Sequence, residues 1–253
     1  MYLIINGHKE YFAVPGNPIA RTHCPPLPDV PLRETHYVTG ELSPDDAPDL
    51  ITTLLWYLYL VRQAHPKLNI RVSDSRINDA CQPLLSALGL QPAADMAHDH
   101  SHHLTRCEAR VLLLLLGGLS VTQVSELLCR DIRTVSTQKV RAIAKAGLEH
   151  NGDLHLLGAQ LYGRSPVRRP PLSLDDYAMI SVIALTGHVS HTAVLLGMPE
   201  RTVSRRKQVI MKKLGVEHDV ALYAALGLSM DRKKAGKLKH KIAAHIKLRE
   251  GQL

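Results

Sequence analysis

The sequence predicts a mixed fold, in which a small α/β domain is followed by two all-α domains built from short helices. Three observations support this prediction. Residues 1–97 alternate strand-like and helix-like segments. Residues 104–228 show helical periodicity interrupted by tight turns, and short sequence matches within them recur at one fixed offset. At 253 residues, the chain is long enough for several small domains that each bury a core.

The α/β domain is expected over residues 1–97. Short runs rich in β-branched and aromatic residues predict strands, and longer apolar runs with helical spacing predict helices. The expected strands are Tyr2–Ile5, Thr35–Val38 and Leu68–Val72, and the expected helices are Leu50–Ala64 and Asn78–Leu88. Residues 1–100 hold 11 Asp and Glu against 7 Lys and Arg, which suggests a regulatory or interaction domain.

A repeat organises the rest of the chain. Three segments recur 68 residues later: Thr134-Val135-Ser136 as Thr202-Val203-Ser204, Lys145 to Leu148 as Lys213 to Val216, and Glu149-His150 as Glu217-His218. Three matches at one offset indicate a duplicated module. The copies are expected over residues 104–162 and 172–228. A His-rich linker over residues 98–103 precedes the first copy, and a proline-rich linker over residues 163–171 separates the two.

The first copy reads as three short helices with tight turns. Thr105, with Glu108 three residues later, predicts a capped helix start, and Gly117-Gly118 predict its end. Ser120 is expected to cap a second helix through Leu128, and Asp131 a third that runs to Gly147. Two short helices joined by a turn of three or four residues make a helix-turn-helix.

The second copy repeats this arrangement. A helix is expected from Leu174 to Leu185, and another from Ser190 to Leu196. The Gly197-Met198-Pro199 turn then breaks the chain before a third helix from Glu200 to Leu214. The predicted architecture is therefore a small α/β N-terminal domain followed by two all-α helix-turn-helix domains. A basic helical tail is expected over residues 229–253.

The charge of the chain is uneven. Residues 101–253 hold 24 Lys and Arg against 12 Asp and Glu, whereas the total formal charge is +8. Such an excess of positive charge points to a polyanionic partner. Double-stranded DNA is the first candidate, and an anionic membrane surface is the less favoured second one because no bulky aromatic residue anchors the basic tail.

Both copies resemble the LuxR/FixJ (NarL) type of helix-turn-helix domain. In the first copy the resemblance rests on Leu104, Thr105, Glu108, Val111, Leu112, Gly118, Leu119, Ser120, Val124, Leu128, Thr134, Val135, Lys145 and Gly147. In the second it rests on Ala193, Leu196, Thr202, Val203, Ile210, Lys213, Leu214, Gly215 and Val216. Asp175-Asp176-Tyr177 departs from the basic and acidic residues usual there. The resemblance implies a bacterial transcription regulator whose third helix enters the major groove and whose fourth helix carries a dimer contact.

The third helix of the second copy carries the better DNA-reading face. Val203, Ile210 and Leu214 form an apolar stripe at helical spacing, which leaves the opposite face polar. By position, the resemblance implies that Ser204, Arg205 and Gln208 face base edges and that Arg206, Lys207, Lys212 and Lys213 lie near phosphates. Thr202 completes the expected DNA-binding set of this copy.

The corresponding face of the first copy is less polar. Ser136, Thr137 and Val140 stand where base contacts are expected, and Lys139, Arg141 and Lys145 are left for phosphates; Thr134 completes the set. Arg130 occupies a position that the family gives to an apolar core residue. The first copy is therefore either a second DNA reader or a dimerisation or partner-binding module.

The N-terminal domain resembles a degenerate response-regulator receiver domain over Leu60 to Ser73, a helix-to-strand passage. A working receiver needs a carboxylate cluster and an acceptor aspartate at the end of its third strand. Gly40-Glu41 stands near that position instead. We therefore expect no phosphorylation on aspartate and a role in protein contacts.

Two function classes remain open. The first is a DNA-binding transcription regulator, activator or repressor, that acts as a homodimer or as a heterodimer with another regulator. The second is an interaction protein that pairs with a LuxR-type regulator and modulates it without reading DNA alone. No phosphate-cradling glycine loop or catalytic motif is visible, so we expect no enzyme activity.

No cofactor, metal or small-molecule ligand is expected. His98, His100, His102 and His103 read as a polar linker because no second ligand cluster accompanies them. The four cysteines lack a C-x-x-C spacing, and the longest apolar stretches are too short to span a bilayer. These features predict a cytoplasmic, nucleoid-associated protein with no membrane partner.

Overall fold

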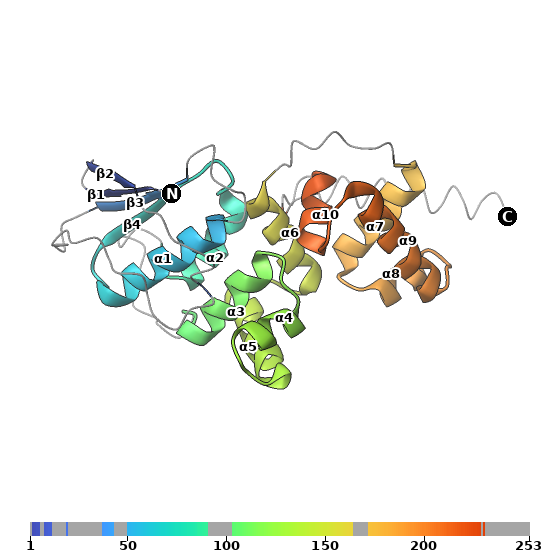
Figure 1. Cartoon of the computed structure of the whole chain (residues 1–253), viewed down its shortest axis with the longest axis horizontal. Helices are drawn as coiled ribbons and strands as arrows, with labels where there is room; N and C mark the ends of the chain where they lie inside the picture. Colours follow the sequence, from blue (N-terminus) through green and yellow to red (C-terminus); the bar gives the residue numbers. More distant parts are fainter. Residues whose placement is uncertain are drawn as a thin grey trace. The chain divides into compact units, whose positions relative to one another are not determined.

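The computed structural model describes residues 2–5, 8–11, 19, 37–42, 50–90, 103–163, 172–228 and 230. The chain forms two compact units, Met1–Leu148 and Glu149–Leu253. Most of the described residues are helical, and the first unit also contains a small sheet (Figure 1). This is the mixed layout that the sequence predicts.

The sheet of the first unit has four strands in the order β2-β1-β3-β4. They are β1 (Tyr2–Ile5), β2 (His8–Tyr11), β3 (Tyr37–Glu41) and β4 (Asn69–Ser73). β1 runs antiparallel to β2 and β3, and β3 runs parallel to β4. The strand prediction is right for β1 and shifted by one to three residues for β3 and β4, and it missed β2.

The antiparallel strands contradict a receiver-like sheet, which is parallel throughout. The cause is local, because only two residues separate β1 from β2 and so short a connection can join only antiparallel strands. What remains of the expected α/β pattern is one parallel unit of β3, α1 (Leu50–Ala64) and β4.

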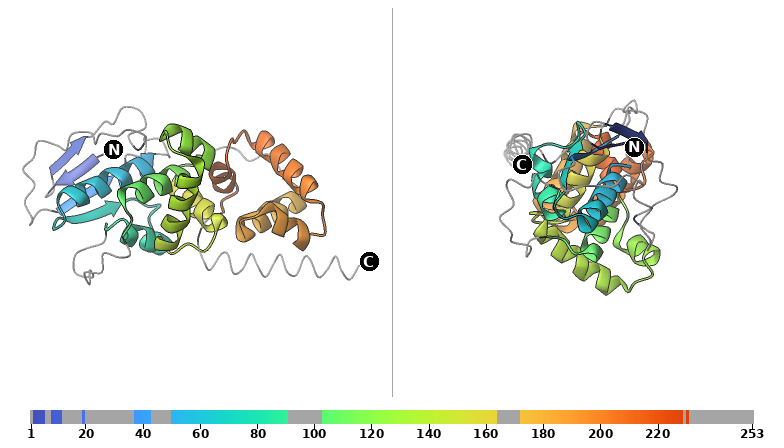
Figure 2. Two further views of the ribbon diagram at one scale, coloured as in Figure 1. Left: turned by 90° about the horizontal axis from the view of Figure 1, so that it is seen from below. Right: turned by 90° about the vertical axis from the view of Figure 1, so that its left-hand side faces the viewer.

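Helix α1 is buried almost all round, from Ile51 to Arg62. It packs on β3 and β4 and also on α3 (Arg106–Leu116), so its apolar surface is covered from two directions. Gly40 of β3 permits the close approach, because a Cβ there would lie 2.7 Å from Cδ1 of Leu58. Figure 1 and Figure 2 show α1 against the sheet in each view. A 3-10 turn, η1 (Asp79–Cys81), and α2 (Gln82–Ala87) follow β4.

Helices α3, α4 (Val121–Leu127) and α5 (Ile132–Lys145) form the rest of the first unit. The three predicted caps are confirmed: Thr105 and Ser120 each form a reciprocal capping box, and Asp131 accepts from the amide of Arg133. The Tyr59 hydroxyl donates to the carbonyl of Leu104 at 3.0 Å and ties α1 to the start of α3.

This packing places the α/β part and the first repeat copy in one compact unit. The division differs from the predicted domains 1–97 and 104–162, because α1 supplies the apolar surface on which α3 packs. Of the predicted His-rich linker over residues 98–103, only His103 lies within the described residues.

The second unit contains five helices in its described part. They are α6 (Asn151–Tyr162), α7 (Leu174–Thr186), α8 (Val189–Leu195), α9 (Glu200–Leu214) and α10 (Asp219–Ala225). Their shared core is mainly aliphatic and includes Ile180, Val203, Ile210 and Leu222. α6 packs on α7 and α10, which is why it belongs to this unit although the first domain was predicted to extend to residue 162. The predicted linker 163–171 and basic tail 229–253 lie outside the described residues, apart from Gly163 and Met230.

The 68-residue repeat is visible in the helix starts. α4 and α8 begin at Val121 and Val189, and α5 and α9 at Ile132 and Glu200. The turn before the third helix is also shared, with φ of +49° at Cys129 and +59° at Gly197. A glycine adopts this left-handed conformation without strain, whereas a cysteine does so at a cost. No helix in the described part of the chain is long and apolar enough to cross a membrane.

Candidate nucleic-acid interface

Helix α9 has well-defined ends. It starts after Pro199, whose extended conformation directs the chain into the helix, and it ends at Gly215, with φ of +64°. The predicted inward stripe is confirmed, because Val203, Ile210 and Leu214 are the buried residues of the helix. The stripe fixes the rotation of α9 about its axis and turns the opposite face towards solvent.

Between residues 172 and 228, positive charge is concentrated on α9. All six Lys and Arg of residues 172–228 lie on this helix, between Arg201 and Lys213. Six residues of the predicted DNA-binding set are exposed or half-buried on this helix: Thr202, Ser204, Arg205, Gln208, Lys212 and Lys213. Within the described residues, Arg201, Arg205, Lys212 and Lys213 form no ion pair, so their charges face solvent.

Two shallow depressions lie along this face. One, of about 600 Å³, is lined by Asp176, Pro199, Arg201, Thr202, Arg205, Arg206, Val209, Ile210 and Lys213. The other, of about 700 Å³, is lined by Glu200, Arg201, Ser204, Arg205 and Gln208. Arg201 and Arg205 border both. The exposed face therefore presents guanidinium, hydroxyl and amide groups together.

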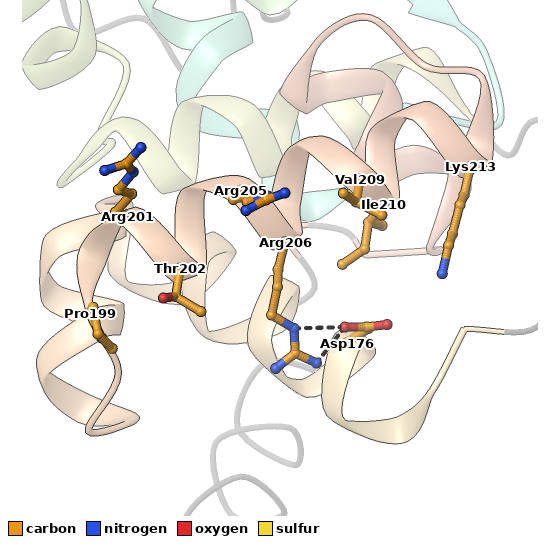
Figure 3. A pocket seen from close by; sticks show the side chains of 9 residues that line it. All are labelled: Asp176, Pro199, Arg201, Thr202, Arg205, Arg206, Val209, Ile210 and Lys213. Carbon is orange, nitrogen blue, oxygen red and sulfur yellow. Dashed lines mark hydrogen bonds and ion pairs between the residues drawn. The ribbon is translucent and has the colours of Figure 1, made fainter.

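Arg206 is held inside the unit. Its Nε and Nη2 donate to Oδ1 of Asp176 on α7, at 3.2 and 2.6 Å. Figure 3 shows Arg206 turned towards this carboxylate and Arg201 pointing away from it. Arg206 was predicted to lie near phosphates, but the structure gives its guanidinium a carboxylate partner of its own.

Lys207 is engaged in the same way. Its Nζ lies 2.6 Å from Oδ1 and 2.7 Å from Oδ2 of Asp219, the first residue of α10. His218 caps α10 by accepting from the amide of Ala221, and burial lowers the pKa of this imidazole although Asp219 and Glu217 oppose the shift. Lys207 thus connects α9 to α10, and the outward cations are Arg201, Arg205, Lys212 and Lys213.

The equivalent face of α5 in the first unit is different. Thr134, Ser136, Thr137 and Arg141 are exposed as predicted, but so are Ile132 and Val140, the latter 66% exposed. Thr137 also directs its hydroxyl back to the carbonyl of Arg133 at 2.9 Å. The face of α5 therefore has fewer groups that could contact a base edge.

Two predicted phosphate contacts on α5 are less available than expected. Lys145 Nζ lies 2.8 Å from Oε2 of Glu108 and 3.0 Å from the carbonyl oxygen of His103. Burial by itself raises the pKa of Glu108, but hydrogen bonds from Lys145 and Thr105 outweigh it and lower that pKa. Lys139 is half-buried, and this burial lowers the pKa of its ammonium.

Three residues of the site were not in the predicted set. Arg201 lines both depressions and lies four residues before Arg205, so the two side chains share one helix face. That spacing was available in the sequence. Asp176 and Asp219 bind cations of α9 from the neighbouring helices α7 and α10, and no spacing along the chain predicts such contacts.

No group of three or more His, Cys, Asp or Glu side chains that could hold a metal ion occurs among the described residues. His98, His100 and His102 lie outside them. The arrangement on α9 is suited to an extended anionic partner, because its cations are spread along a convex helix and its depressions are shallow.

Comparisons with known proteins give one distant relative. No protein-family model matches the chain, and no solved structure matches it. The chain is similar to the uncharacterized protein YjjQ of Escherichia coli O157:H7, with 28% identity over 111 residues. The match covers 43% of this chain and 46% of the relative, so the aligned part is about half of each.

Proposed function

We propose that the protein is a bacterial DNA-binding transcription regulator of the LuxR/FixJ helix-turn-helix type, with α9 as its recognition helix in the major groove of double-stranded DNA. In this proposal α8 and α9, joined by the Gly197 turn, form the helix-turn-helix of the second copy. The protein acts in the cytoplasm on the nucleoid, without a cofactor and without enzyme activity of its own.

One observation carries the proposal: the outward face of α9 combines exposed cations with side chains of the kinds that pair with base edges. Arg201 and Arg205 border both depressions, and Ser204 and Gln208 lie beside them. An arginine pairs with the O6 and N7 of guanine, and a glutamine with the N6 and N7 of adenine. Lys212 and Lys213 extend the positive charge towards the end of the helix, where a phosphate backbone would pass.

The ion pairs of α9 assign a different role to two residues. Arg206 and Lys207 bind Asp176 and Asp219, on α7 and α10 respectively. These contacts restrain α9 against its neighbours in addition to the buried stripe. We therefore propose that Arg206 and Lys207 position the recognition helix, and that Arg201, Arg205 and Gln208 contact DNA.

The test is selection of a binding site by the purified full-length chain from a library of random duplexes, followed by footprinting of the recovered sequence. We expect enrichment of a defined sequence, with protection in the major groove and an affinity that falls steeply with salt. Failure to enrich any sequence, together with binding that does not depend on salt, would contradict the proposal.

A second candidate is supported by the first unit. The exposed side chains of Leu127, Ile132 and Val140 place apolar area around the turn and face of α4 and α5. Such a surface suits a protein partner better than DNA, and this favours an interaction protein that pairs with another LuxR-type regulator. Val140→Lys separates the candidates: it should abolish binding to such a regulator if α5 is a protein-binding face, and should leave DNA binding by the isolated chain intact.

A further inference from the structure

Helices α6 and α10 are the same element of the two repeat copies. Each follows the third helix of its copy, and their first residues, Asn151 and Asp219, are separated by the repeat offset. Each is capped by the same device. Nδ1 of His150 accepts from the amide of Asp153, and Nδ1 of His218 accepts from the amide of Ala221, both at 3.2 Å.

These two helices pack on each other. Their contact is the most extensive between any two helices of the second unit. Leu156 and Ala159 of α6 join Leu222 and Tyr223 of α10 in the buried core. The pairing lies wholly within the second unit, because that unit begins at Glu149.

Equivalent residues meet in this contact. His155 and Tyr223 occupy the same position of the repeat, 68 residues apart, and their ring centroids are 6.2 Å apart. In an interface between two identical chains related by a two-fold axis, residues near the axis meet their own counterparts. The α6 and α10 pair has this property within one chain.

Polar and steric contacts hold α6 in place. Nδ1 of His155 lies 3.8 Å from Oδ2 of Asp219, the carboxylate that also binds Lys207. At the other end of the packing, Gly152 lies so close to α7 that a Cβ would meet the backbone of Ala184 and Gly187. The fit of α6 is therefore specific to the second copy.

We propose that α6 is the internal partner of α10, so that the fourth helices of the two copies pair within one chain as the fourth helices of two chains pair in a symmetric dimer. The consequence is that a single chain, rather than two, occupies its DNA site. This stoichiometry rests on the proposed DNA-binding function, whereas the internal pairing does not. It replaces the expectation of a homodimer or heterodimer formed through the fourth helix.

The physical reason is that the apolar face of α10 is already filled. Val220, Leu222 and Tyr223 of α10 are buried in the single chain, with exposed fractions of 1%, 0% and 1%. A second chain could pack on this face of α10 only by expelling α6, which would expose Leu156 and Ala159. Pairing of two chains through α10 would therefore bury no more surface than it exposes on α6.

The experiment combines two forms of the full chain with one duplex. The chain and a longer fusion of it are mixed with a duplex of about 30 base pairs, roughly three helical turns, recovered by selection. A gel-shift measurement then counts the complexes. We expect two complexes, one for each form. A third complex of intermediate mobility would show that two chains share the site and would overturn the proposal.

Light scattering of the protein without DNA gives an independent result. We expect a mass near 28.0 kDa at all concentrations, the mass of one chain. A mass of twice this value would overturn the internal pairing. If no duplex gives a shifted complex, the proposed function fails, while the mass of the unbound protein still decides the internal pairing.

Discussion

Asp176 on α7 and Arg206 on α9 form a two-point contact, in which Nε and Nη2 of the guanidinium donate to a single carboxylate oxygen, Oδ1. The contact neutralises one cation of α9 and places a carboxylate in the lining of the depression of about 600 Å³. Asp176 therefore limits the positive potential of the face that we propose to meet DNA.

Replacing Asp176 with asparagine should increase affinity for DNA. The change removes a negative charge from the depression and weakens the hold on Arg206, which then becomes available to a phosphate. The buried stripe and the Lys207–Asp219 ion pair still hold α9 in position. We expect the slope of log affinity against log salt to steepen by about 0.9, the value for one added phosphate contact. Fluorescence anisotropy with a labelled duplex measures this slope.

Asp175→Asn is the matched control. It removes the same charge from the neighbouring residue on α7, which does not line the depression. If both variants change the slope equally, the effect is one of net charge and does not come from release of Arg206.

Replacing Glu108 with glutamine should destabilise the first unit in a way that depends on pH. The carboxylate is only 6% exposed and binds Lys145 and the amide of Thr105. Because these contacts lower the pKa of Glu108 in the folded state, its stabilisation is present above the ordinary carboxyl pKa of about 4.3 and is lost as the pH falls through the lowered value. We expect the free energy of unfolding of the first unit to fall by about 2 kcal/mol near neutral pH.

Fluorescence of Trp56, the single tryptophan of the chain, reports unfolding of the first unit in urea. The free energy of unfolding of the wild type and of Glu108→Gln should converge as the solution is acidified below about pH 4. A difference that stays constant down to about pH 3 would show that ionisation of Glu108 does not contribute.

Replacing Gly152 with alanine should destabilise the second unit. The added Cβ would clash with the carbonyl oxygen of Ala184, a backbone atom that cannot rotate away. Overpacking of this kind costs about 1–3 kcal/mol, although alanine by itself favours a helix. Thermal unfolding followed by circular dichroism should show the loss, while the Trp56 signal of the first unit stays unchanged.

Gly117→Ala provides the comparison for this steric effect. Its Cβ would come no closer than 3.4 Å to any neighbour, and the backbone φ of −73° suits alanine. We expect Gly117→Ala to change the free energy of unfolding by no more than about 0.5 kcal/mol. Equal effects of the two substitutions would contradict the tight packing of α6 against α7.

The sequence predicted the helices of the repeat well, because their ends depend on residues close in the chain. Thr105, Ser120 and Asp131 cap helices within three residues of themselves, and each was recognised. The buried stripe of Val203, Ile210 and Leu214 followed from helical spacing alone. Local signals therefore predicted both the elements and the exposed face of α9.

Contacts between distant segments could not be predicted in this way. The packing of α6 on α10 depends on which apolar faces meet, and nothing in the spacing of Leu156 or Leu222 specifies a partner. The ion pairs of Arg206 and Lys207 join different helices, so the sequence alone does not reveal that these two of the six cations of α9 bind carboxylates within the protein. The β1 and β2 hairpin was missed because the alternation over His8–Tyr11 is too polar to stand out as a strand.

The central claim, that α9 reads DNA, is tested most directly by Arg201→Ala with Arg205→Ala, compared with Arg133→Ala and Arg141→Ala on α5. Both pairs remove two exposed cations from a third helix of the repeat. Anisotropy titrations at several salt concentrations, on a duplex selected by the wild type, give affinity and salt slope. We predict that the α9 pair lowers affinity by about tenfold or more and reduces the slope by up to about 1.8, and that the α5 pair changes affinity by less than about threefold. Unchanged binding by the α9 pair, or a larger loss with the α5 pair, would contradict the account.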